Sequence, residues 1–211
     1  MPDQKPKQNR IKLSALFDFF LMTVLIGSLL LVLYIMPHDS FNFWWVLIFL
    51  IILVPTLRAL VNGAPFVPTP LARARKIAAL AKIKPGEKVY DIGCGDGRMV
   101  YFAANEFGAN AIGLELSPLV YVLARVRKFF WKSKAKIIFR DFHFYNLKDA
   151  DVILCYLMPE TLAKLQSKLE KELKPGARVV SYAFQIGNWK ETHHELKDPA
   201  NNLASIWVYK R

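Results

Sequence analysis

Three glycines at alternating positions follow an apolar run that ends in an acid, and the segment 89–97 contains Asp91, Gly93, Gly95 and Gly97. Glycine adopts positive φ and lets a ligand approach the backbone without a Cβ in between. A strand that turns through such a loop into a helix offers free backbone N–H groups to a bound ligand. The pattern therefore predicts an α/β chain with a ligand-binding loop after one of its strands.

A second acid, Glu115, lies twenty residues beyond Gly95 and ends another short apolar run. At the tip of the neighbouring strand, such a carboxylate can accept both hydroxyls of a ribose. The dinucleotide-binding spacing G-x-G-x-x-G is absent, because Arg98 stands where its third glycine would be, and a P-loop Lys-Ser/Thr pair is absent too. What remains resembles the first two motifs of class I S-adenosylmethionine-dependent methyltransferases. A glycine-rich turn of another α/β enzyme is the alternative.

This resemblance implies S-adenosylmethionine as the cofactor, and no metal. It implies that the glycine loop lies against the methionine half of the cofactor and that Glu115 holds the ribose. Asp141 and Phe142 follow the third expected strand, where the family has an acid for the adenine amino group beside an apolar residue. The full set of expected cofactor-binding residues is Phe66, Thr69, Asp91, Gly93, Gly95, Gly97, Glu115, Asp141 and Phe142.

The chain from residue 67 onward alternates between patterns typical of strands and of helices. A doubly wound, seven-stranded Rossmann-like methyltransferase sheet is therefore the expected fold. The expected strands are 87–92, 110–115, 136–140, 151–157 and 178–184, with a closing hairpin at 191–196 and 204–209; the expected helices lie within 67–84 and at 98–107, 118–130 and 162–173.

A narrower resemblance covers the chain from about Pro65 to its C-terminus. The segments that carry it are 65–69 (PFVPT), 91–98 (DIGCGDGR), 113–118 (GLELSP), 156–159 (YLMP) and 175–180 (PGARVV). They resemble the small membrane-anchored lysine methyltransferases that modify the mitochondrial ATP synthase c-subunit and the adenine nucleotide translocase, and their prokaryotic relatives. The eukaryotic relatives usually have serine at Cys94 and one apolar anchor, so the substrate stays open.

The resemblance implies methyl transfer to a lysine ε-amine on a membrane or membrane-proximal protein. The Asn/Asp-Pro-Pro-Tyr signature of enzymes that methylate adenine or glutamine is absent after the fourth expected strand. Tyr156 and Pro159, with Phe66 as a further wall, are the candidate acceptor pocket, and no general base is assigned. The alternatives are a lipid or quinone methyltransferase and, in another class, a membrane-tethered RNA-binding protein with a non-catalytic cofactor fold.

Two uncharged apolar runs, Phe19–Met36 and Phe41–Leu57, precede this region. Each spans roughly 25–27 Å as a helix, close to the ~30 Å of a bilayer core. Basic residues flank both runs and are absent between them, which places both flanks in the cytoplasm. We therefore expect a transmembrane helical hairpin in a multi-pass protein of the cell membrane with a cytoplasmic catalytic domain; a hairpin within one leaflet is the alternative. The expected parts are a basic N-terminus (1–12), two transmembrane helices (13–61, about 13–36 and 41–61), a linker (62–70) and the methyltransferase domain (71–211).

The chain is strongly basic, with a net charge of +12, and seven of its Lys and Arg residues lie within 125–140 around Phe129-Phe130-Trp131. Basic residues interleaved with aromatic ones bind nucleic acid or an anionic lipid surface. Because the apolar runs point to a membrane, we favour lipid over nucleic acid; a solvated helix face is a third interpretation. The expected lipid contacts are Lys128, Lys132, Lys134 and Lys136.

Overall fold

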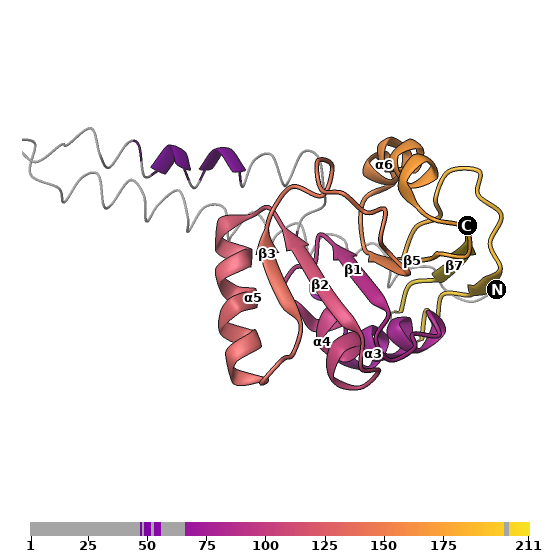
Figure 1. Ribbon diagram of the computed structural model, residues 1–211, viewed down its shortest axis with the longest axis horizontal. Coiled ribbons are helices and arrows are strands. Elements are labelled where there is room, and N and C mark those ends of the chain that lie inside the picture. The colour runs from indigo at the N-terminus through magenta and orange to yellow at the C-terminus, as the bar shows by residue number, and fades with distance from the viewer. Residues whose placement is uncertain (1–46, 48, 52, 56–65, 201–202) are drawn as a thin grey trace, which may run out of the picture. The chain divides into compact units, whose positions relative to one another are not determined.

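Seven strands form one sheet in the computed structural model, in the order β3-β2-β1-β4-β5-β7-β6 (Figure 1). Strands β1 to β5 pair in parallel, and β7 is antiparallel to both β5 and β6. The predicted seven-stranded Rossmann-like sheet is therefore confirmed. The strands are β1 Lys88–Ile92, β2 Asn110–Glu115, β3 Lys136–Phe139, β4 Val152–Cys155, β5 Arg178–Tyr182, β6 His193–Glu195 and β7 Ile206–Lys210.

The chain divides into two compact units, Met1–Phe49 and Leu50–Arg211, and the sheet belongs to the second. The residues that the structure describes are 47, 49–51, 53–55, 66–200 and 203–211.

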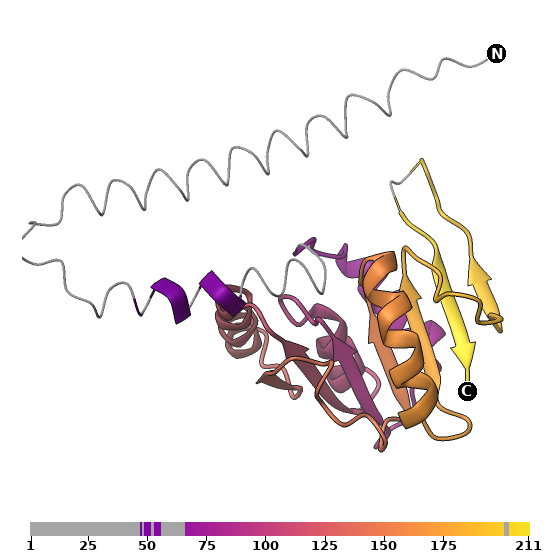
Figure 2. The same ribbon diagram turned by 90° about the horizontal axis from the view of Figure 1, so that it is seen from above.

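Helices cover both faces of the sheet, as Figures 1 and 2 show. Side chains of α3 and α4, with Ala124 of α5, join one buried apolar cluster, and Leu162, Leu165 and Leu169 of α6 join the other. The strands alternate between the two clusters because successive side chains of a strand point to opposite faces. The helices are α3 Leu71–Leu80, α4 Arg98–Asn105, α5 Pro118–Phe130 and α6 Pro159–Glu172.

The strand order places one edge of the sheet for ligand binding. Strand β1 lies between β2 and β4, so the chain leaves β1 toward one side of the sheet and later returns to pair on its other side. In open α/β sheets, ligands bind beyond the carboxyl ends of the strands at such a switch point. The loops after β1, β2, β3 and β4 are therefore where the candidate site is expected.

The expectation of a membrane-spanning hairpin is not met. Within the part of the chain that the structure describes, no helix is both long and apolar enough to cross a membrane. This overturns the prediction of a multi-pass protein of the cell membrane with a cytoplasmic catalytic domain, because a span needs about 20 consecutive apolar residues in a helix. The run Phe19–Met36, and most of the predicted parts 1–12, 13–61 and 62–70, lie outside the described residues.

Candidate cofactor and acceptor site

The loop that joins β1 to α4 has a backbone that favours glycine. Gly93, Gly95 and Gly97 have φ values of 75°, 56° and 81°, a region that side chains with a Cβ rarely adopt. The N–H groups of Gly93 and Cys94 both donate to the Leu114 carbonyl, at 2.9 and 3.0 Å, which ties the loop to β2. The predicted loop thus lies at the carboxyl end of β1, directly beside the end of β2.

The segment that precedes α3 packs on this loop. A Cβ at Gly95 would lie 3.0 Å from the Phe66 ring, so the absence of a side chain at Gly95 makes room for that ring. Thr69 is buried, and its carbonyl accepts a hydrogen bond from Nη1 of Arg98 at the start of α4. Both residues that the sequence assigned to the cofactor site from this segment therefore lie beside the glycine loop.

Glu115 ends β2 and organises the backbone around it. Its Oε2 accepts the N–H of Gly95 at 3.0 Å, and its Oε1 accepts those of Leu116 and Ser117 at 2.9 and 2.8 Å. Burial raises the pKa of Glu115, while the three donors act in the opposite direction. Three of the roughly four lone-pair sites of the carboxylate are thus used within the protein.

Asp91, on β1, is enclosed and unpaired. Its side chain is fully buried, and neither carboxylate oxygen has a hydrogen-bond partner among the residues that the structure describes. Burial first, and then the charges of Glu115 and Asp96, raise the pKa of Asp91 well above its usual range. A buried acid without a partner is costly, so its presence at a glycine loop points to a cationic ligand group.

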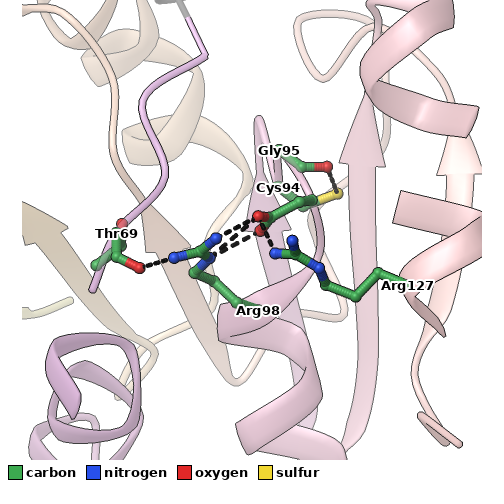
Figure 3. A network of polar contacts seen from close by, with 6 residues as sticks. Thr69, Cys94, Gly95, Arg98 and Arg127 are labelled. Atoms are coloured by element: carbon green, nitrogen blue, oxygen red, sulfur yellow. Dashed lines mark hydrogen bonds and ion pairs between the residues drawn. The ribbon is translucent and has the colours of Figure 1, made fainter. Parts of the chain in front are cut away.

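Asp96 is the one acid of this edge that two arginines compensate, and sequence reasoning missed it. Its side chain is 3% exposed and pairs with Arg98 of α4 and with Arg127 of α5. Nε of Arg98 lies 2.9 Å from Asp96 Oδ1, and Figure 3 shows both guanidinium groups facing the glycine loop. When Asp91, Asp96 and Glu115 are all ionised, three carboxylates face two guanidinium groups, which leaves one uncompensated negative charge.

Asp141 and Phe142 follow β3, as predicted, but they are engaged within the protein. Asp141 Oδ1 accepts the backbone N–H of His143 and contacts its Nδ1, both at 2.9 Å. The Phe142 ring stacks on the His143 ring at 4.3 Å between centroids and is buried in the cluster under α6. A contact of either residue with adenine therefore stays a prediction.

The candidate acceptor pocket contains an aromatic pair that the sequence did not indicate. Tyr156, just after β4, packs edge-to-face on Tyr182 of β5, with 4.8 Å between ring centroids. Burial, and secondarily Tyr182, raise the pKa of Tyr156, so its phenol stays neutral. Arg73 of α3 lies with Cζ 5.7 Å from the Tyr182 ring centroid and pairs with Glu195. Pro159 is exposed and begins α6, two residues beyond the buried Leu157.

Comparison with solved structures supports the class of fold. An RNA methyltransferase from Salinibacter ruber, in complex with S-adenosyl-L-homocysteine, has a TM-score of 0.63 and 29% sequence identity; the match covers 68% of this chain and 93% of that one. TrmN from Thermus thermophilus has a TM-score of 0.57 at 18% identity and covers 67% of this chain and 48% of its own, which supports the fold alone. The fold and the glycine loop thus define an S-adenosylmethionine-dependent methyltransferase.

Comparison of sequences identifies the family. A family model described as the ANTKMT methyltransferase domain matches residues 91–193. A protein-lysine N-methyltransferase of Saccharolobus islandicus is 34% identical over 71% of this chain and 94% of its own length. The human lysine N-methyltransferase of the ATP synthase c-subunit is 27% identical over 90% and 74%, and the mouse adenine nucleotide translocase lysine N-methyltransferase 33% over 69% and 62%. The chain belongs to the family of S-adenosylmethionine-dependent protein-lysine N-methyltransferases, which confirms the predicted resemblance, enzyme class and cofactor.

Proposed function

We propose that the accepting lysine belongs to a membrane or membrane-proximal protein and reaches the cofactor beside Tyr156 and Pro159. The observation that carries this placement is the aromatic pair of Tyr156 and Tyr182 at the carboxyl ends of β4 and β5, next to the strand that bears the glycine loop. Two of the relatives, named for the c-subunit of ATP synthase and for the adenine nucleotide translocase, support a protein acceptor. The lipid and RNA alternatives are not favoured, because the relatives with the highest coverage are named for protein lysines.

We further propose that Asp91 and the glycine loop hold the methionine part of S-adenosylmethionine. The unpaired, buried Asp91 carboxylate fits the cofactor's ammonium group, and a loop that a Cβ at Gly95 would crowd fits a ligand lying close to the backbone. When bound, the cofactor supplies a methyl group from its sulfonium. Asp91 then compensates a positive charge, and its own unpaired charge is compensated in return.

Glu115 is proposed to accept one ribose hydroxyl rather than two. Its carboxylate already accepts three backbone N–H groups, which leaves about one acceptor site. A second hydroxyl would have to displace the Gly95 N–H, and that bond holds the glycine loop. Glu115 thus shapes the loop and binds the sugar with the same carboxylate.

The accepting amine must lose a proton before it can attack. A free lysine, with a pKa near 10.4, is less than about 0.1% neutral at pH 7, and only the neutral amine has a lone pair for the methyl group. Burial between aromatic rings disfavours the ammonium form and lowers the pKa of the amine. We therefore assign this desolvation to Tyr156 and Tyr182, with the neutral Tyr156 hydroxyl as a hydrogen-bond acceptor for the N–H groups of the amine. The amine's proton leaves to solvent.

The test uses the full-length chain, radiolabelled S-adenosylmethionine and isolated membranes. Label in a protein band that protease removes, and that acid hydrolysis converts to methylated lysine, is the expected result. Label in the organic extract identifies a lipid acceptor, and label removed by ribonuclease an RNA acceptor; either result refutes the proposal. Tyr156→Phe keeps the ring contact with Tyr182 and removes the hydroxyl, so we expect it to bind cofactor normally and to lose activity about 10-fold or more. Tyr145→Phe, in the opposite apolar cluster, is the matched control.

A further inference from the structure

Helix α5 exposes an apolar stripe. Six of its thirteen residues are exposed apolar side chains, and Phe129 and Phe130, at its C-terminal end, are 78% and 73% exposed. Their spacing of three and four residues places them along one side of the helix. In Figure 1, α5 lies at the outer end of the sheet beside β3. The stripe consists of Leu119, Val122, Leu123, Val126, Phe129 and Phe130.

This stripe is not part of the domain core. Within α5, Ala124 is the residue classed as buried, and it packs between the helix and the first apolar cluster. Surface helices normally turn their apolar side toward the core, and a contiguous exposed apolar patch on a folded domain marks an interaction surface. The structure therefore leaves the apolar side of α5 available for contact with another surface.

The charges around the stripe are of one sign. Residues 116–140 contain no Asp or Glu. Arg125, Lys132, Lys134 and Lys136 are all exposed beside the stripe. Apolar side chains bordered by cations match an anionic lipid surface, where the cations meet the headgroups and the apolar groups enter the acyl boundary. A second copy of this chain would instead bring like charges together, which opposes self-association.

Two basic residues of the stretch are engaged within the protein. Lys128 Nζ donates to the carbonyls of Ser133 and Ala135, at 2.9 and 2.5 Å, so this side chain ties the turn after α5. Arg127 pairs with Asp96 and lies 4.9 Å from the centroid of the Trp131 ring. The expected lipid contact of Lys128 is therefore replaced by one of Arg125, while Lys132, Lys134 and Lys136 stay available.

We propose that α5 is an interfacial helix that lies in the plane of an anionic lipid surface, with its apolar stripe inserted and the four exposed cations at the headgroups. The contact involves the surface of one leaflet and requires no helix that crosses it. The inference rests on the proposed function only for the purpose of such docking, which is to hold the acceptor pocket near membrane-proximal lysines. Arg127 connects α5 to Asp96 in the glycine loop, so the docked helix and the cofactor site are parts of one rigid connection.

The decisive experiment places a fluorophore on α5 of the full-length chain. Cys94 and Cys155 are both buried, so an exposed cysteine can be labelled selectively. Phe130→Cys carries an environment-sensitive dye, and the matched control is Leu196→Cys, because Leu196 is 72% exposed just beyond β6. The vesicles contain phosphatidylcholine with phosphatidylglycerol and a lipid spin-labelled near its headgroup. We expect quenching several-fold stronger at position 130 than at position 196.

The readout is local to α5, so attachment of the chain to vesicles through any other segment does not produce it. Replacing Lys132, Lys134 and Lys136 together by glutamine, or using phosphatidylcholine alone, should reduce the quenching at position 130 several-fold, while calorimetric binding of S-adenosylhomocysteine is unchanged. Equal quenching at positions 130 and 196, or none at either, overturns the proposal. A dye response that appears without lipid and grows with protein concentration identifies a second copy as the occupant instead. No methyl acceptor is present, so a failure here is separate from a failure of the proposed function.

Discussion

Replacement of Asp91 by asparagine alters the charge of one enclosed side chain and leaves its shape almost unchanged. Both oxygens of this carboxylate are buried without a partner among the described residues, and its pKa is raised mainly by burial. An unsatisfied buried group costs about 1–3 kcal/mol, and a charged one more. We therefore expect Asp91→Asn to raise the free energy of unfolding of the cofactor-free protein by about 1 kcal/mol at pH 7.

The same change should weaken cofactor binding, because the proposed partner of Asp91 is the ammonium group of the cofactor. Hydrogen bonds to a charged group contribute about 1.5–3 kcal/mol, which corresponds to a roughly 10- to 150-fold increase in the dissociation constant. Stability and affinity thus move in opposite directions. A residue with a purely structural role would not separate them in this way.

Urea unfolding without cofactor and calorimetric titration with S-adenosylhomocysteine measure the two effects. Asp151→Asn is the matched control, because the Asp151 carboxylate pairs with Lys174 at 2.5 Å and accepts the Lys88 N–H at 2.7 Å. The pKa of Asp151 is lowered by these partners, so its replacement should destabilise the fold and leave cofactor affinity unchanged. If Asp91→Asn behaves like Asp151→Asn, our account of Asp91 is refuted.

Three further predictions follow from the same loop. Because the folded pKa of Asp91 lies above its usual value of 3.8, the stabilisation is complete below that pH and declines as the pH rises through the folded pKa; urea titrations from about pH 4 to pH 8 should show this decline, and Asp91→Asn should reduce it. Glu115→Ala should weaken S-adenosylhomocysteine binding by about 1.5–3 kcal/mol by calorimetry, since three backbone donors lose their acceptor; unchanged affinity contradicts this. Gly95→Ala, with φ at 56° and a Cβ 3.0 Å from Phe66, should lower the free energy of unfolding by about 1–3 kcal/mol in urea, whereas Gly86→Ala, where a Cβ meets nothing within 4 Å, should cost less.

Local sequence pattern was sufficient to predict the sheet. Strand β2 occupies residues 110–115, as its short apolar run indicated, and β4 is buried at every position, as a strand covered on both faces must be. The prediction for β4 ran two residues too far, to Leu157, because apolar residues continue past the end of the ladder. Leu157 is buried under α6 without pairing in the sheet, so burial alone did not mark the strand's end.

Contacts between distant residues could not be predicted in this way. Lys128 read as one member of a solvated basic stretch, yet its ammonium group is held by two backbone carbonyls within the turn that follows α5. Tyr182 read as an ordinary residue at the end of a strand, and its contact with Tyr156 depends on the parallel pairing of β4 with β5. A hydrophobic period indicates which side of an element is buried, but it does not specify which polar or aromatic groups meet there.

Asp96 shows most clearly how such a contact shapes the site. It stands between two glycines that must keep positive φ, and its partners lie at the start of α4 and near the end of α5. Through Arg98 it also connects the loop to the Thr69 carbonyl, and so to the segment that carries Phe66. The net stabilisation from a buried ion pair is small, because desolvation offsets the attraction, but loss of one partner leaves a buried charge exposed to no counter-ion. The network therefore restricts the glycine loop to one geometry more than it stabilises the fold, and that restriction leaves Asp91 as the single uncompensated acid at the edge where the cofactor is proposed to bind.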